Sequence, residues 1–253
     1  GRSEQGYDLL FQINYLAGFL FTERLLPLLA SGSGKSCGRV VQVVSTKHWA
    51  VNGDDLIVDV DATSVGKAPL ASRSTQRSRN HVDNSYGNSK LAQLWHARAL
   101  ASRHPNLETI GACPSWAATG IAGDHPNRDV LTTQAFATSD CGPGITSILN
   151  AMLRTSEELQ SAMGSDATEY VANSRVWTDL LPPGKGWWIT SQRVARWRAQ
   201  IVFYCTMVIL FTQQWFHANF ILQATSPESK DQVRAERLYQ WSLRAVQPWL
   251  VKE

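Results

Sequence analysis

The order strand, helix, strand in the middle of the chain constrains the fold more than any other feature. A β-branched run at Arg39–Ser45 is typical of a buried parallel strand, and Leu107–Cys113 predicts a second short strand. Between them, Ser85–Arg103 has the apolar spacing of a helix. Two strands joined through a helix run parallel with a right-handed crossover, so the sequence predicts an α/β fold.

The flanking segments predict further helices. Tyr7–Leu29 is a long apolar helix, and Pro27 should end or kink it. Residues 46–84 are polar and weakly periodic, so we expect a long loop with one helical turn. Three more elements are expected toward the C-terminus: a helix at Ile145–Arg154, a short strand at Thr168–Val171 and an amphipathic helix at Pro227–Trp249.

The composition suits one large or two small soluble domains, since 43% of the 253 residues are hydrophobic and 18% are charged. The net charge is only +3 and the basic residues are scattered, so we expect no nucleic-acid partner. The four cysteines and six histidines show no metal-ligand spacing. We therefore expect no metal site, and reduced thiols in a cytoplasmic protein.

Tyr86 and Lys90 are the strongest candidates for chemistry. Residues four apart on a helix stand on one face, one turn apart, which places a phenol beside an ammonium. A nearby positive charge favours the phenolate form, and this helps a tyrosine to exchange protons near neutral pH. An exposed helix face carrying the same two residues is the structural alternative.

Polar residues at strand ends and in the first helix are further candidates. Ser45 closes the first strand, and Pro114–Thr119 follows the second. Ligands of open parallel sheets bind at the carboxyl ends of strands, so both segments are placed to reach one. Asn14 lies inside the apolar helix, where an amide needs a partner. Each residue also has a purely structural alternative. In these alternatives Ser45 caps local backbone, Pro114–Thr119 is a proline-initiated turn, and Asn14 is a core asparagine whose hydrogen bonds are satisfied.

An apolar segment at 187–222 leaves three alternatives open. It combines an eleven-residue apolar run, Ile201–Phe211, with nearby tryptophans and arginines. Basic and aromatic residues beside an apolar segment suit a membrane surface. A buried core helix fits as well, and a full span is weakened by the polar residues within the segment.

Four of these residues resemble the catalytic tetrad of the short-chain dehydrogenase/reductase family. They stand in the family's order and context: Asn14, Ser45, Tyr86 and Lys90. The family's Tyr-x-x-Ser-Lys form is met in full by residues 86–90. Phe11–Leu20 looks like the family's Asn-bearing helix, and Ser226–Trp249 is similar to the C-terminal helix of retinol-dehydrogenase-like and WW-domain-oxidoreductase-like members.

The resemblance implies a role for each of these residues. Tyr86 would be the general acid/base, and Lys90 would support it and hold the nicotinamide ribose. Ser45 would orient the substrate oxygen, and Asn14 would support a water that links Lys90 to solvent. The implied cofactor, NAD or NADP, would be held by six residues: Tyr86, Lys90, Pro114, Ser115, Trp116 and Thr119.

The resemblance also implies the architecture. Residues 1–253 would form a single partial Rossmann-like domain, the C-terminal portion of a doubly wound parallel sheet with extra C-terminal helices, and 187–222 would be an apolar insertion within it. The sequence departs from the family in several respects, among them the absence of the family's first four strands and of their Asn-Ala-Gly segment. It also contains no glycine-rich dinucleotide fingerprint, position 115 is Ser instead of Gly, and the loop between Ser45 and Tyr86 is longer. Together with the absence of an initiator Met, the missing fingerprint suggests a fragment, a processed product or an incomplete gene model.

The function implied by the resemblance is NAD(P)-dependent interconversion of a lipophilic alcohol and its ketone or aldehyde, such as a retinoid or sterol. The alternative is a catalytically inactive remnant or an interaction module that lacks the dinucleotide-binding half. The partners expected are a lipophilic small molecule, a membrane surface contacted through 187–222 and a second copy of the chain. The expected location is the cytoplasm or the cytosolic face of an internal membrane.

Overall fold

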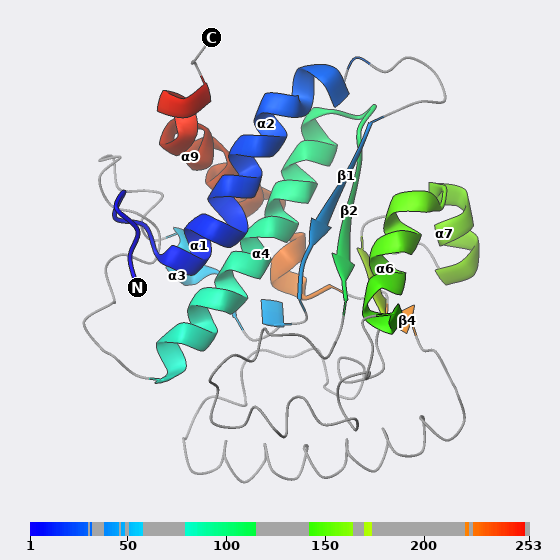
Figure 1. The fold of residues 1–253 in the computed structure, drawn as a ribbon, viewed down its shortest axis with the longest axis horizontal. Coiled ribbons are helices and arrows are strands. Elements are labelled where there is room, and N and C mark those ends of the chain that lie inside the picture. The colour runs from blue at the N-terminus through cyan, green and yellow to red at the C-terminus, as the bar shows by residue number, and fades with distance from the viewer. Residues whose placement is uncertain are drawn as a thin grey trace, which may run out of the picture. The chain divides into compact units, whose positions relative to one another are not determined.

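The computed structural model contains helices and a small parallel sheet (Figure 1). The structure describes residues 1–29, 31, 38–45, 47–48, 51–57, 79–114, 142–163, 170–173, 221–222 and 225–250. These residues contain both helices and strands, which confirms the mixed α/β class. The chain divides into two compact units, Gly1–Gly111 with Thr225–Glu253, and Ala112–Ala224.

In the first unit, the sheet consists of β1 (Arg39–Val43) beside β2 (Glu108–Cys113), and the two strands run in the same direction (Figure 1). An ion pair between Arg39 and Glu108 joins the start of β1 to the start of β2. Helix α4 (Arg79–Arg103) connects the two strands along the chain and packs against β1. The predicted strand–helix–strand unit is therefore present.

The N-terminal segment is one continuous helical stretch with an irregular turn inside it. It runs as α1 (Leu9–Phe11), the π-helical turn η1 (Gln12–Leu16) and α2 (Ala17–Leu29). Asp8 caps its start by accepting a hydrogen bond from the Phe11 amide at 3.0 Å. Pro27 lies within α2, and the helix ends only two residues later, close to where the sequence predicts a break.

The C-terminal helix α9 (Gln232–Leu250) closes the core of this unit by packing against α4 and α2. The short 3-10 helix η5 (Pro227–Lys230) precedes it, and Ser226 caps η5. The core between these helices combines aliphatic and aromatic side chains, and the largest of its fully buried side chains are Trp95, Tyr15, Phe11 and Phe19. Burial of this apolar surface is the main stabilising term of the unit.

A short segment between β1 and α4 approaches α4 closely. It contains the single-turn helix α3 (Asp54–Ile57), in agreement with the one helical turn expected in this loop. Gly53 has a φ of +76°, and a Cβ at this position would lie 2.4 Å from the Trp95 ring. Both the left-handed backbone and the contact with Trp95 require glycine here.

The second unit contains two helices and two short strands among its described residues. They are α6 (Gly142–Leu153), α7 (Ser156–Met163), β3 (Tyr170–Asn173) and β4 (Ile221–Leu222). β3 and β4 pair antiparallel, with Ala172 opposite Leu222, and α6 packs against β3. Apart from β4, the segment 187–222 lies outside the described residues. The single Rossmann-like domain with an apolar insertion at 187–222 therefore stays a prediction.

Candidate functional site

Helix α4 carries the predicted acid/base pair on one face. Tyr86 is half-buried, and Lys90 is only 9% exposed. The Nζ of Lys90 lies 5.6 Å from the centroid of the Tyr86 ring. This distance is within the range of a cation–π contact. The i, i+4 spacing therefore brings the ammonium and the phenol ring together, and the pair is not an exposed helix face.

Oxygen acceptors on β1 and on α4 itself hold the Lys90 ammonium. Its Nζ donates to the carbonyl oxygen of Val43 at 2.9 Å and to Oε1 of Gln93 at 3.0 Å. Val43 is the last residue of β1, so the ammonium lies at the carboxyl end of that strand. A buried charge is costly unless hydrogen bonds replace water, and these two contacts do so.

Asn14 contacts the same motif through Ser89. Its Nδ2 donates to Ser89 Oγ at 3.0 Å, and Ser89 Oγ donates to the Tyr86 carbonyl at 2.8 Å. Asn14 lies in the π-helical turn η1, a distortion that is frequent at functional sites. The Asn14 side-chain amide therefore has a hydrogen-bond acceptor. This is expected both of a residue that supports the site and of an asparagine that is satisfied within the core.

Ser45 lies two residues beyond the end of β1, because the strand stops at Val43 and not at Ser45 as predicted. Its hydroxyl oxygen accepts a hydrogen bond from the Lys47 amide at 3.3 Å. This is the local capping contact expected of a serine at the end of a strand. A role for Ser45 in binding substrate stays a prediction.

His48 fixes the loop that carries Ser45. Its ring is fully buried, Nδ1 donates to the Ser45 carbonyl at 2.7 Å, and Nε2 accepts from the Ser226 amide at 3.1 Å. Because Nε2 is an acceptor, the ring proton resides on Nδ1 and the imidazole is neutral. Burial lowers the pKa of His48 to about 4, despite the opposing hydrogen bond to Ser45.

Gly87 allows the same loop to lie directly against α4. A Cβ on Gly87 would stand 2.9 Å from the Lys47 carbonyl oxygen and 2.9 Å from Cγ1 of Val51. Real side chains do not approach backbone oxygen so closely. The residue after Tyr86 is therefore small because the loop that follows β1 occupies the space beside it.

The predicted cofactor-binding loop is described only at its first residue. Pro114 is half-buried and directly follows β2. Ser115, Trp116 and Thr119 lie outside the described residues. The structure thus brings Tyr86 and Lys90 together on α4, which the Asn14–Ser89 contact joins to η1. Cofactor binding by the loop that starts at Pro114 remains a prediction.

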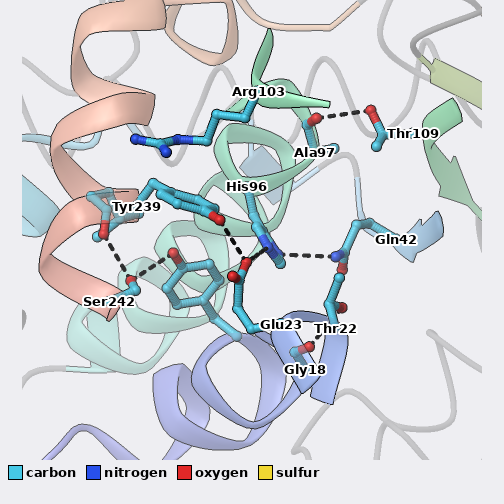
Figure 2. Close-up of polar contacts among 12 residues, drawn as sticks. Gly18, Thr22, Glu23, Gln42, His96, Ala97, Arg103, Thr109, Tyr239 and Ser242 are labelled. Atoms are coloured by element: carbon cyan, nitrogen blue, oxygen red, sulfur yellow. Dashed lines mark hydrogen bonds and ion pairs between the residues drawn. The ribbon is translucent and has the colours of Figure 1, made fainter. Parts of the chain in front are cut away.

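A second polar cluster is buried in the same unit (Figure 2). Gln42 Nε2 donates to Nδ1 of His96 at 3.2 Å, and Nε2 of His96 lies 3.7 Å from a carboxylate oxygen of Glu23. The Tyr239 hydroxyl donates to the same oxygen at 2.8 Å. Burial lowers the pKa of His96, and the neighbouring carboxylate opposes that shift. The cluster links β1, α2, α4 and α9.

Sequence reasoning missed Gln93, Ser89 and His48. Gln93 is a polar residue three positions after Lys90 on a predicted helix, so this spacing was a usable signal. Ser89 belongs to the recognised Tyr-x-x-Ser-Lys form, but its link to Asn14 joins positions 75 residues apart. The same holds for His48 and Ser226, whose contact depends on the tertiary fold.

No family model matches the sequence, and no curated protein matches it significantly. Among the described residues, no group of His, Cys, Asp or Glu side chains is arranged to hold a metal ion. None of the helices in the described part of the chain combines the length and hydropathy needed to cross a bilayer.

Proposed function

We propose that the chain is an oxidoreductase of the short-chain dehydrogenase type, with a Rossmann-like sheet, in which Tyr86 exchanges a proton with the oxygen of a lipophilic alcohol or carbonyl compound. The observation that carries the proposal is the Lys90 ammonium, held at the end of β1 and 5.6 Å from the Tyr86 ring. A phenol beside a fixed positive charge is a competent general acid/base.

The residues of the site have separable roles in this proposal. In the reducing direction the Tyr86 hydroxyl donates its proton to the substrate oxygen, and in the oxidising direction the phenolate accepts it. Lys90 stabilises the negative phenolate electrostatically. The chain from Asn14 through Ser89 to the Tyr86 carbonyl holds the turn of α4 that carries the phenol. Ser45, on the loop next to Val43, orients the substrate oxygen.

The cofactor expected is NAD or NADP, which supplies or accepts the hydride when bound. Tyr86 and Lys90 fit the ribose end of such a dinucleotide, since an ammonium and a phenol are suited to hydrogen-bond its hydroxyl groups. The phosphate end has no matching glycine-rich turn in the sequence. No step of the proposed proton transfer depends on that end.

The proposal is tested by turnover with a matched pair of tyrosine variants. NADPH or NADH oxidation is followed with retinal or a ketosteroid, using wild type, Tyr86→Phe and Tyr7→Phe. Tyr7 is half-buried, and its ring makes a T-shaped contact with the Trp241 ring. We expect Tyr86→Phe to lose at least about 100-fold in rate, the contribution of a positioned acid/base, while Tyr7→Phe retains activity. Equal rates in wild type and Tyr86→Phe would remove Tyr86 from the mechanism.

A non-catalytic interaction protein is the second candidate, and the lack of a glycine-rich fingerprint favours it. The exposed apolar residues of the N-terminal helices, Ile13, Phe21 and Leu28, favour it as well. Calorimetric titration with NADPH and NADH separates the two candidates. Micromolar binding that weakens in Lys90→Met supports the oxidoreductase. No heat of binding with either dinucleotide supports the interaction protein.

A further inference from the structure

Gln93 is a buried polar residue whose side chain faces the candidate site. It is 8% exposed and lies on α4 three residues after Lys90. Its Oε1 accepts a hydrogen bond from Lys90 Nζ at 3.0 Å. A side-chain amide in such a place is retained only if its hydrogen bonds offset the cost of burying it.

The two acceptors on the ammonium differ in kind. Val43 contributes a backbone carbonyl, which is present whatever the side chain at that position. Gln93 contributes a side-chain oxygen, so its presence depends on the residue type. Both acceptors are neutral, so they hold the ammonium without cancelling its charge. A carboxylate at position 93 would pair with Lys90 and compete with the phenolate of Tyr86 for the same positive charge.

We propose that Gln93 is a positioning residue that fixes the Lys90 ammonium between β1 and the Tyr86 ring. Four methylene groups give a lysine side chain many rotamers, and two oxygen acceptors in fixed positions select one of them. The effect on catalysis rests on the function proposed above. The effect on the geometry and the proton exchange of Lys90 does not depend on that function.

The geometric part is tested on the full chain by NMR of the lysine ammonium groups in a ¹⁵N-lysine-labelled sample. A buried, hydrogen-bonded ammonium exchanges protons with water slowly enough to be observed, and the Lys90 signal is assigned by its loss in Lys90→Arg. We expect Gln93→Met, which has similar volume but no oxygen, to shift the signal or broaden it beyond detection. Gln93→Glu retains an oxygen acceptor and should keep the signal, shifted by the added charge.

Gln240→Met is the matched control, because Gln240 is also partly buried in a helix and donates to Glu236 within α9. It should leave the Lys90 signal unchanged. An unchanged Lys90 signal in Gln93→Met, with circular dichroism equal to wild type, overturns the proposal. If Gln93→Met does not fold, the test depends on Gln93→Glu, which retains an oxygen acceptor. Loss of the Lys90 signal in folded Gln93→Glu then overturns the proposal as well, because the acceptor would be present without holding the Lys90 ammonium.

The catalytic part is tested by the pH dependence of turnover. Loss of one hydrogen bond to a charged group corresponds to a change of about tenfold or more. We expect Gln93→Met to lower kcat by that factor and to displace the pH–rate profile, whereas Gln240→Met leaves both unchanged. A changed Lys90 signal in a chain without turnover would refute the proposed function and leave the positioning role intact. An unchanged signal in an active chain would refute only the role of Gln93.

Discussion

The buried imidazole of His48 makes a specific prediction about stability and pH. Burial lowers its pKa to about 4 in the folded chain, whereas an exposed histidine titrates near about 6.5. Between these values the unfolded chain binds a proton at this site and the folded chain does not. Stability therefore falls as the pH drops from about 7 to about 4, and the full contribution of the neutral ring is present above about pH 6.5.

The magnitude follows from the difference between the two pKa values. A gap of about 2.5 units at about 1.4 kcal/mol per unit gives roughly 3 kcal/mol of unfolding free energy lost over that pH range. The side chain is fully buried, so solvent screening does not reduce this figure. Typical domains are stable by about 5–15 kcal/mol, so the effect is large enough to measure.

The test compares wild type with His48→Asn by urea unfolding, followed by circular dichroism at pH values from about 7 to about 4. Asparagine can replace Nδ1 as donor to Ser45 but leaves the Ser226 amide unpaired, so the variant should be about 1–3 kcal/mol less stable at about pH 7. The difference in unfolding free energy between wild type and His48→Asn should close or reverse at about pH 4. Only wild type loses the stability that the neutral His48 ring contributes at higher pH. Other titrating groups cancel in the difference.

His104→Asn is the control, since His104 lies half-exposed just after α4. This variant retains the His48 imidazole and its hydrogen bonds to Ser45 and Ser226, so it should still lose stability as the pH falls toward about 4. A stability gap between wild type and His48→Asn that stays constant from about pH 7 to about pH 4 would refute the buried, neutral assignment of His48.

Two further predictions concern packing and the second polar cluster. Gly18→Ala should stabilise α2 by about 0.5–1 kcal/mol, because a Cβ at this position meets nothing within 4 Å. Gly87→Ala should instead destabilise the chain by about 1–3 kcal/mol, because a Cβ there would lie 2.9 Å from the Lys47 carbonyl oxygen. Urea unfolding measures both changes, and equal effects of the two substitutions would contradict the close contact at Gly87. Glu23→Gln should lower the pKa of His96 further by removing the carboxylate that opposes burial; an NMR titration of the imidazole showing no downward shift would contradict the pairing.

Much of the first unit could be predicted from apolar periodicity. The strands near Arg39 and Glu108, the helix between them and the C-terminal helix all lie close to their predicted positions. The strands are marked by β-branched and apolar runs, and α9 is marked by an apolar repeat on its buried face. Their ends are less predictable. Helix α4 begins at Arg79 instead of Ser85, in a polar stretch that lacks an apolar repeat.

One missed element did carry a sequence signal. Helix α7 follows a reciprocal cap in which the Glu158 amide donates to Thr155 Oγ1 at 3.1 Å and the Thr155 amide donates to the Glu158 carboxylate at 2.8 Å. This Thr-x-x-Glu pattern is the capping box, visible in the sequence before Ser156–Met163.

The contacts that hold the candidate site could not be predicted in the same way. The spacing of Tyr86 and Lys90 predicts their proximity, because helix geometry alone determines it. The bond from Asn14 to Ser89 and the position of Val43 beneath Lys90 depend on how α4 packs against η1 and β1. Sequence spacing carries no information on such long-range contacts.

In the proposed reaction Tyr86, supported by Lys90, transfers a proton while a hydride moves between the dinucleotide and the substrate. The most direct measurement is mass-spectrometric detection of deuterium moved from C4-deuterated NADPH or NADH to retinal or a ketosteroid. We expect deuterium in the alcohol product with wild type and with Tyr7→Phe, and only background incorporation with Tyr86→Phe. Absence of deuterated alcohol with wild type, or undiminished incorporation with Tyr86→Phe, would contradict the proposed reaction.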